Sequence, residues 1–297
     1  MPQQRLRIAL QKSGRLSKPS LALLKACGLK FSWRNKLISR AEGMAIEALL
    51  VRDDDIPSLV ADGMADMGVV GENLVAEHRL ASGNPAGSPK SVSVALPLGF
   101  GHCRLMIAVR HGMAYDGPQS LNGTTIATTY PALVADFLNR HGVRAGIVQL
   151  SGSVEIAARL GMADVVCDLV VTGSTLEEHA LRPTDTILSS QAVLIRNDTL
   201  SPEKLAIAAQ LMQRLRGVLA ATETKYIMLH APVSQLATIK ALLPGSKSPT
   251  ILALEGIDDV VALHAVCRES VFWETMEQLK AAGASSILVI PIEKMLD

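Results

Sequence analysis

The sequence predicts an α/β protein with two lobes in its first two-thirds and a separate small domain after them. Three observations predict this. Short apolar runs rich in β-branched residues alternate with helical patterns up to about residue 200, which indicates parallel strands joined by helices. A long helical pattern then follows over 202–221. Beyond it, the order strand, helix, strand, strand, helix, strand predicts a ferredoxin-like (βαββαβ) domain.

The first part alternates between predicted strands and helices. Strands are expected at 5–10, 47–51, 66–70, 103–110, 124–128, 147–150 and 165–171. Helices are expected where Pro or Ser stands at a first turn and Gly follows the last one. These helices begin near Ser17, Asp55, Pro131, Ser153 and Thr175, whereas 82–90 is expected to be a loop. This arrangement favours two lobes, one on either side of a cleft.

The last part has the spacing of a small appended domain. Strands are expected at 225–229, 250–254, 260–266 and 286–290, and helices at 232–242 and 270–281. Such a module more often regulates or oligomerises than catalyses.

Composition excludes several classes of function. The 297 residues are 48% hydrophobic and 19% charged, as in a globular protein of two or three domains. The net charge of +1 and an aromatic content of 3% argue against a nucleic-acid partner or an anionic membrane surface. The four cysteines are widely spaced, as in a protein with reduced thiols. We find no signal peptide and no apolar run of the roughly 18 residues that span a membrane, so we expect a cytoplasmic protein.

The stretch 155–176 carries the strongest chemical signal. A buried strand is interrupted by the charge of Asp168, and the turn Thr172-Gly173-Ser174-Thr175 follows it directly. The amides and hydroxyls of such a turn, together with a helix N-terminus, can bind a phosphate group. An ordinary strand-to-helix turn with a Ser or Thr cap explains the same residues equally well.

Two other loops carry charges at the expected carboxyl ends of strands. The link 12–15 contains Lys12, Gly14 and Arg15, which suit the oxyanions of a nucleotide. A solvated turn is the alternative. The acids 53–55 could bind Mg²⁺ together with a phosphate group, although capping and solvated roles are more common.

One motif resembles that of a known class of enzyme. The residues DLVVTGST (168–175) look like the phosphoribosyl-pyrophosphate motif of phosphoribosyltransferases, in which acids and apolar residues precede T-G-x-T. Where the common form has two adjacent acids, this sequence has Cys167 and Asp168. The difference indicates a divergent family.

The whole chain resembles the long form of the ATP phosphoribosyltransferases, the first enzymes of histidine biosynthesis. Six segments match motifs of that family in the right order: LRIALQKSGRL, VRDDDIPSLVADGMADMGVVGEN, GSVEIAARLGMADVVCDLVVTGSTL, TKYIMLHAP, LPGSKSPTI and GASSILVIPIEKM.

The resemblance implies a fold and a reaction. The fold is a two-lobed core like that of periplasmic binding proteins, followed by a regulatory ferredoxin-like domain. We expect lobe I at 1–104 and 190–223, lobe II at 105–189 and the regulatory domain at 224–297. The reaction joins N1 of ATP to C1 of phosphoribosyl pyrophosphate, with release of pyrophosphate. The implied enzyme is a Mg²⁺-dependent homo-hexamer or dimer that L-histidine inhibits.

The resemblance also implies roles for individual residues. Expected catalytic residues are Asp168, Glu155 and Arg15, of which Asp168 and Glu155 would also bind the metal. Phosphoribosyl pyrophosphate would contact Asp168, Leu169, Val170, Thr172, Gly173, Ser174 and Thr175. ATP would contact Lys12, Gly14, Arg15, Arg52, Asp66 and Glu72. Histidine would bind His230, Ser248, Thr250 and Ser285. Alternatively, the segment SKSPT (246–250) could be an ordinary turn, and His230 could simply end a strand.

A rival from another class is a non-catalytic binder of small ligands with the same two-lobed fold. The absence of an export signal argues against a transport protein, and the absence of an N-terminal helix-turn-helix argues against a gene regulator. Neither a transport protein nor a gene regulator explains the phosphate-type turn at 172–175.

Overall fold

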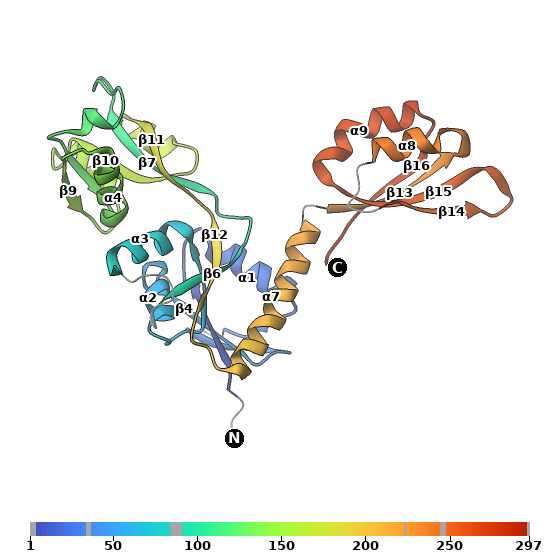
Figure 1. The fold of residues 1–297 in the computed structure, drawn as a ribbon, viewed down its shortest axis with the longest axis horizontal. Coiled ribbons are helices and arrows are strands. Elements are labelled where there is room, and N and C mark those ends of the chain that lie inside the picture. Colours follow the sequence, from blue (N-terminus) through green and yellow to red (C-terminus); the bar gives the residue numbers. More distant parts are fainter. Residues whose placement is uncertain (1–3, 34–36, 84–90, 223, 244–247, 296–297) are drawn as a thin grey trace. The chain divides into compact units, whose positions relative to one another are not determined.

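The computed structural model describes residues 4–33, 37–83, 91–222, 224–243 and 248–295. The chain divides into two compact units, 1–209 and 210–297, and the division falls inside α7 (Pro202–Thr222) (Figure 1). The expected boundary at 223/224 therefore stays a prediction. Most of the expected loop at 82–90 lies outside the described residues.

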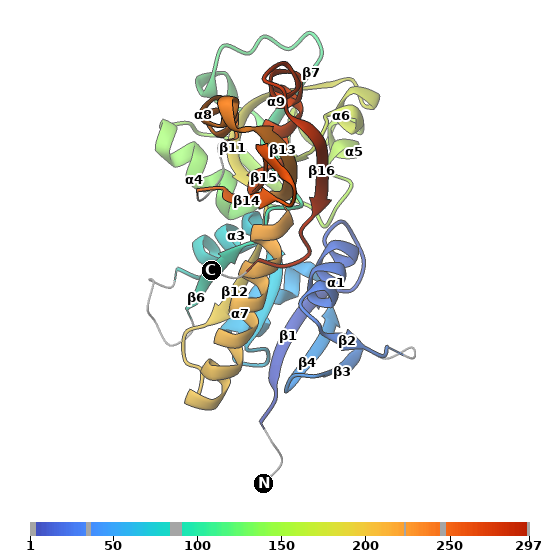
Figure 2. The same cartoon turned by 90° about the vertical axis from the view of Figure 1, so that its right-hand side faces the viewer.

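Lobe I of the first unit contains a seven-stranded sheet in the order β2-β3-β4-β1-β5-β12-β6. Its strands are β1 (Leu6–Gln11), β2 (Lys30–Phe31), β3 (Ile38–Glu42), β4 (Ile46–Val51), β5 (Met67–Gly71), β6 (Val92–Pro97) and β12 (Ala192–Asn197). Figure 2 shows β1 beside β4. The successive residues Ile8, Ala9 and Leu10 are fully buried and point to alternate faces, as in a strand covered on both faces. Because β4, β1 and β5 are parallel, their carboxyl ends meet at one edge, where open α/β sheets bind ligands.

The helices of lobe I follow these strands. They are α1 (Ser17–Ala26), the 3₁₀ turn η1 (Asp53–Asp55), α2 (Ile56–Ala61) and α3 (Glu72–Ser82). As expected, Gly28 follows α1 in the left-handed region, with φ of 84°, and Pro57 lies in the first turn of α2. Helix α3 was not anticipated. Its first residue directly follows β5, so it begins at the ligand-binding edge.

Lobe II contains a five-stranded sheet in the order β11-β7-β10-β8-β9. Its strands are β7 (Cys103–Arg110), β8 (Thr125–Thr128), β9 (Gly146–Gln149), β10 (Val165–Val170) and β11 (Leu181–Ser190). Its helices are η2 (Pro118–Leu121), α4 (Pro131–His141), α5 (Val154–Arg159) and α6 (Ser174–Glu178). The chain passes between the lobes twice, after β6 and after β11. Two α/β lobes with two crossings form the periplasmic-binding-protein-like core that the sequence predicts.

The expectation of parallel sheets was wrong for several strands. β7 is antiparallel to both β10 and β11, and β12 is antiparallel to both β5 and β6. The chain leaves lobe I through β6 and returns through β12, so these strands run against their neighbours. An alternating pattern of strands and helices does not record this direction. Sequence reasoning also missed β2, β3, β6, β11 and β12.

The second unit has the predicted ferredoxin-like order. After α7 come β13 (Thr224–Pro232), η3 (Val233–Gln235), α8 (Leu236–Leu242), β14 (Thr250–Leu254), β15 (Ile257–Arg268), α9 (Glu269–Ala281) and β16 (Ser285–Pro291). The sheet order is β14-β15-β13-β16, antiparallel throughout. Ile227 and Leu229 of β13 are buried with Ile239 of α8 and Leu279 of α9. One face of the sheet is therefore covered by the two helices.

Candidate active site

Strand β10 brings a carboxylate to the ligand-binding end of lobe II. Asp168 is only partly exposed, and its Oδ1 accepts a hydrogen bond from the amide of Leu169 at 2.7 Å. Burial raises the pKa of Asp168 above its ordinary value, and the charge of Glu155 raises it further, while the Leu169 amide and the charge of Arg15 lower it. Two other expected catalytic residues, Glu155 and Arg15, are therefore within electrostatic range of Asp168.

Glu155 lies on the short helix that follows β9 in lobe II. It lies in the first turn of α5, after Ser153, whose φ of 50° is left-handed. Ser153 occupies the N-cap position as expected, but its side chain makes no capping hydrogen bond. Arg110 of β7 donates hydrogen bonds to the carbonyls of Ala158 and Ala163. These bonds tie the C-terminal end of α5 and the residues before β10 to β7.

The turn after β10 has an open backbone conformation that suits an anion. Gly173 has φ of 94°, and the hydroxyls of Thr172 and Ser174 lie 3.1 Å apart. The turn is largely exposed. Helix α6 has five residues, so its dipole adds less to anion binding than a longer helix would. The amide and hydroxyl donors of the turn itself are therefore the main feature that suits anion binding.

The loop between β1 and α1 is fixed by Gln11, which sequence reasoning did not single out. Gln11 Nε2 donates to Asp53 Oδ2 at 2.8 Å, and its Oε1 accepts the amide of Leu16 at 2.9 Å. A Cβ on Gly14 would lie 2.5 Å from Gln11 Nε2, and Gly14 has φ of 118°. Glycine is therefore required there, and the loop holds Arg15 against the site.

Arg15 connects the two lobes. Its Nη2 donates to Cys103 Sγ at 3.6 Å, although Arg15 follows β1 of lobe I and Cys103 begins β7 of lobe II. Arg15 also lowers the pKa of Asp168. The cationic loop and the strand β10 therefore face the same site.

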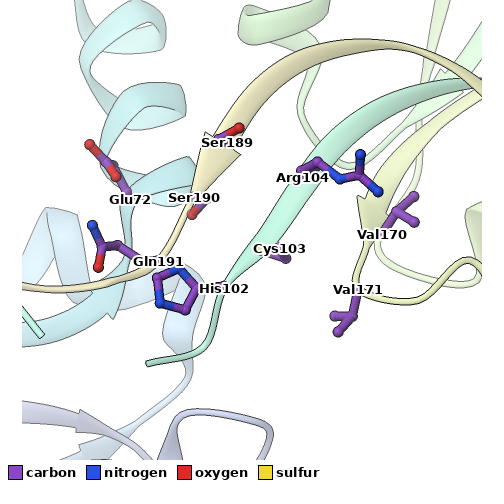
Figure 3. A pocket seen from close by; sticks show the side chains of 9 residues that line it. All are labelled: Glu72, His102, Cys103, Arg104, Val170, Val171, Ser189, Ser190 and Gln191. Carbon is purple, nitrogen blue, oxygen red and sulfur yellow. The ribbon is translucent and has the colours of Figure 1, made fainter. Parts of the chain in front are cut away.

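A cavity of about 340 Å³ lies next to these residues. Its lining comes from α3, from the two crossing segments and from the end of β10: Glu72, His102, Cys103, Arg104, Val170, Val171, Ser189, Ser190 and Gln191 (Figure 3). Of the residues expected in the site, Glu72 and Val170 line it. Arg104 pairs in register with Val170, so a cation lies beside the turn. His102, Arg104 and Gln191 belong to no motif recognised in the sequence, and only the fold brings them to the cavity.

Asp66 lies away from this site, so the prediction that it binds ATP is not supported by its position. It precedes β5 and is 4% exposed, because its carboxylate accepts Lys204 Nζ at 2.8 Å and the amide of Arg7 at 2.8 Å. A residue before a strand belongs to the opposite edge of the sheet from Lys12 and Arg15. Arg52 forms a surface ion pair with Asp54 at 3.6 Å.

The residues expected to bind histidine lie in the second unit. His230 of β13 pairs in register with Ser285 of β16, and Thr250 of β14 pairs with His264 of β15. Because residues paired in register share a face and successive residues alternate, His230, Ser285 and Thr250 belong to the face opposite the buried Ile227 and Leu229. Ser248 lies just before the first residue of β14.

Carboxylates for a metal are few. Within the described residues, no group of three or more His, Cys, Asp or Glu side chains is placed to hold a metal ion. Mg²⁺ is usually held by only one or two carboxylates together with substrate phosphates. The charge of Glu155 acts on Asp168, so two carboxylates near one another are available for that requirement. Among the described helices, none is long and apolar enough to cross a membrane.

A strand that carries a partly buried acid and ends in a phosphate-type turn, opposite a cationic loop, is the arrangement expected of a phosphoribosyltransferase. A family model described as ATP phosphoribosyltransferase (HisG) matches residues 52–217, and one for the C-terminal domain of HisG matches 221–294. An ATP phosphoribosyltransferase of Maricaulis maris (strain MCS10) is 50% identical over 294 residues, which cover 98% of this chain and 99% of that protein.

A solved structure agrees with this match. A chain of the ATP phosphoribosyl transferase (HisG:HisZ) complex from Thermotoga maritima is 25% identical, with a TM-score of 0.59, and the match covers 71% of this chain and 96% of that one. The chain belongs to the ATP phosphoribosyltransferase family. It is a glycosyltransferase that transfers the 5-phosphoribosyl group of phosphoribosyl pyrophosphate to ATP, the first step of histidine biosynthesis.

Proposed function

We propose that phosphoribosyl pyrophosphate binds to lobe II and ATP to lobe I, and that transfer occurs where Arg15 meets Asp168. The observation that carries this proposal is the pairing of Arg15 with Cys103 at 3.6 Å together with its effect on Asp168. A cation from lobe I contacts the first residue of β7, and its charge acts on the partly buried acid of lobe II, so the two substrates can meet at this point. We keep the expected boundaries near 104/105, 189/190 and 223/224 as part of this proposal; the first falls inside β7, so Cys103 and Arg104 lie where the chain enters lobe II.

On lobe II, the turn 172–175 grips the 5-phosphate and Asp168 orients the ribose hydroxyls. Leu169 and Val170 line the approach through their backbone. Arg104, which the sequence did not indicate, lies beside Val170 in the cavity. We assign it to the pyrophosphate group, because a guanidinium binds phosphate oxygens in a bidentate manner.

On lobe I, Lys12 and Arg15 bind phosphate oxygens, with Gly14 keeping their loop in shape. Arg52 adds a further cation at the same sheet edge, and Glu72 lines the cavity. Asp66 has no role in this proposal, because Lys204 and the Arg7 amide already occupy its carboxylate.

The chemistry requires few protein groups. The lone pair on N1 of ATP forms the bond to C1 of the ribose, and the electrons of the C1–oxygen bond leave with pyrophosphate. No strong base is needed, since N1 carries no proton to remove. Arg15, Arg104 and Lys12 stabilise the negative charge that develops on the leaving group. Alignment of the two substrates supplies much of the rate.

We assign Mg²⁺ to Asp168 and Glu155. When bound, the cation would neutralise the charge of the two carboxylates and of the pyrophosphate. Asp168 orients the ribose, and Glu155, at the start of α5, supplies the second carboxylate.

We also propose that histidine inhibits the enzyme by binding to residues 224–297, at His230, Ser248, Thr250 and Ser285. The shared sheet face of His230, Ser285 and Thr250 supports this assignment. The enzyme would act as a homo-oligomer, a hexamer or a dimer. The exposed Leu252, Leu288 and Ile290 of this sheet support an assembly that covers them.

An assay of pyrophosphate release from ATP and phosphoribosyl pyrophosphate tests the substrate assignment. Arg15→Gln should lower kcat/KM roughly 10-fold to 100-fold, the loss expected for one charged hydrogen bond of ~1.5–3 kcal/mol. Arg140→Gln is the matched control, because Arg140 pairs with Asp136 on the surface of α4. Equal activity of the two variants would refute the proposed placement.

A further inference from the structure

Helix α3 of lobe I presents two polar side chains to the N-terminus of α4 in lobe II. Asn73 and Glu77 lie four residues apart, so they share one face of α3. Both side chains form hydrogen bonds to the start of α4, and the two helices lie next to each other (Figure 1). Neither Asn73 nor Glu77 lines the cavity, although Ser190, a partner of Asn73, does.

Glu77 caps a helix that belongs to the other lobe. Its Oε1 accepts the amide of Ala132 and its Oε2 accepts the amide of Leu133, each at 2.8 Å. Amides in the first turn of a helix have no acceptor within that helix, and a negative charge is favoured beside them. The N-cap residue of α4, Tyr130, makes no side-chain capping bond. Glu77 therefore supplies the acceptors that the local sequence does not.

Asn73 ties the same region to the crossing segment. It is 3% exposed. Its Nδ2 donates to Tyr130 Oη at 3.0 Å, and its Oδ1 accepts the hydroxyl of Ser190 at 2.8 Å. The amide of Asn73 donates back to Ser190 Oγ at 3.0 Å, where β11 ends and the chain returns to lobe I. Burying these groups is favourable only while all of them remain paired.

The start of α4 is linked to the site through β8. The amide of Tyr130 donates to Thr128 Oγ1 at 2.9 Å, and Thr128 pairs in register with Cys167, next to Asp168. Burial raises the pKa of the Tyr130 phenol, and the charge of Asp168 adds to the effect. A shift of α4 relative to α3 would therefore move β10 and its carboxylate relative to the loop 12–15.

We propose that Glu77 and Asn73 are positioning residues for phosphoribosyl transfer, holding the lobes at the angle at which the two substrates align. The inference rests on the proposed assignment of one substrate to each lobe. Neither residue touches a substrate. Both act through the N-terminus of α4, so losing them should lower the rate of transfer while each lobe keeps its affinity for its own substrate.

The test compares Glu77→Gln and Glu77→Ala with the control Asp136→Asn, a carboxylate on the surface of α4. Glutamine keeps one acceptor oxygen and loses the charge, whereas alanine loses both acceptors. We expect kcat to fall about 10-fold for the glutamine variant and about 100-fold for the alanine variant, in line with the effect of a ~1 Å misalignment. The separate dissociation constants of ATP and phosphoribosyl pyrophosphate, measured by calorimetry, should stay close to those of the unmodified chain. Hydrogen exchange should accelerate at the amides of Ala132 and Leu133, and Asp136→Asn should change none of these quantities.

Two results would overturn the proposal. Faster exchange at both amides with an unchanged kcat would show that the contact has no part in alignment. Unchanged exchange would show that Glu77 does not hold these amides. If the alanine variant loses protection throughout α4 and β10, it has unfolded and the glutamine variant decides. Failure of the substrate assignment would look different, because Gly173→Ala would then leave the affinity for phosphoribosyl pyrophosphate unchanged, whatever the Glu77 variants do.

Discussion

At the scale of single residues, two aspartates that look alike in the sequence have opposite surroundings. Asp66 is buried with a cation and an amide against its carboxylate. Asp168 is partly buried with another acid nearby, so its pKa is raised. A paired carboxylate stabilises a fold, whereas a carboxylate whose pKa is shifted by burial and by a nearby charge is typical of a functional site.

Asp168→Asn should increase stability and decrease activity. With the pKa of Asp168 raised above 3.8, the native state binds this proton more tightly than the unfolded chain does. The free energy of unfolding therefore falls as the pH rises from 3.8 through the raised pKa, and it stays lowered at neutral pH. Asparagine removes that loss, so urea denaturation at pH 7 should give a higher free energy of unfolding, and the gain should shrink as the pH is lowered toward about 4. Turnover should fall on the order of 100-fold. A parallel loss of stability and turnover would instead mark Asp168 as a structural carboxylate.

Asp66→Asn should have the reverse effect. Breaking a buried ion pair costs roughly 3–5 kcal/mol, and the lower end applies because the Lys204 side chain keeps 23% exposure. Chemical denaturation should show this loss, while calorimetry should show an unchanged dissociation constant for ATP. A weakened affinity for ATP at unchanged stability would restore Asp66 to the ATP site.

At the scale of elements, the turn after β10 depends on a backbone conformation that few residues adopt. Gly173 has φ of 94°, and a Cβ placed there would meet only Val170 Cγ1, at 3.9 Å. The fold itself would therefore accommodate a side chain in space. What the side chain would disturb is the conformation of the turn and the approach of an anion to it.

Gly173→Ala should weaken the binding of phosphoribosyl pyrophosphate beyond its effect on stability. The matched control is Gly142→Ala, since Gly142 has φ of 65°, with nothing within 4 Å of its added Cβ. Both variants should lose ~1–2 kcal/mol locally, the cost of a left-handed conformation in a non-glycine residue. Only Gly173→Ala should lower the affinity for the substrate by calorimetry. If both variants bind it alike, the phosphate does not lie at this turn.

At the scale of the whole molecule, the second unit folds around its own core. Leu263 and Leu279 are fully buried within it, and its four-stranded sheet is complete by itself. A module of this kind can carry a regulatory site without contributing to the catalytic one. Regulation by histidine would then require a coupling of typically ~1–3 kcal/mol between the two sites.

Ending the chain at Thr222 should abolish the binding of histidine. The cut keeps α7 complete and removes β13 to β16, whereas all the proposed substrate contacts lie upstream of it. Calorimetry with histidine is the decisive measurement, because activity could fall for reasons of assembly. His230→Ala in the full chain provides a second variant, and it should lower the affinity for histidine while the KM values without histidine stay the same. Histidine binding by the shortened chain would refute the regulatory assignment.

The sequence by itself determined most of the elements, the ferredoxin-like order of the last unit and the family. These follow from local signals: apolar periods of 2 and 3.6 residues, Pro and Gly at helix ends, and short motifs such as TGST. The resemblance of six segments to that family also implied Asp168, Glu155 and Arg15 as catalytic residues. Local patterns were enough for the elements, whereas the family and these roles came from segments spread along the whole chain.

Only the tertiary structure decided the direction of several strands and the partners of the charged groups. Asp66 pairs with Lys204 across 138 residues, Arg15 reaches Cys103 across 88, and Glu77 caps α4 across 55. Nothing in the flanking residues distinguishes the buried Asp66 from the exposed Asp54, because burial is set by segments that are remote in the chain. The surroundings of a charge, and therefore its pKa and its role, come from packing between distant segments, which a local pattern does not contain.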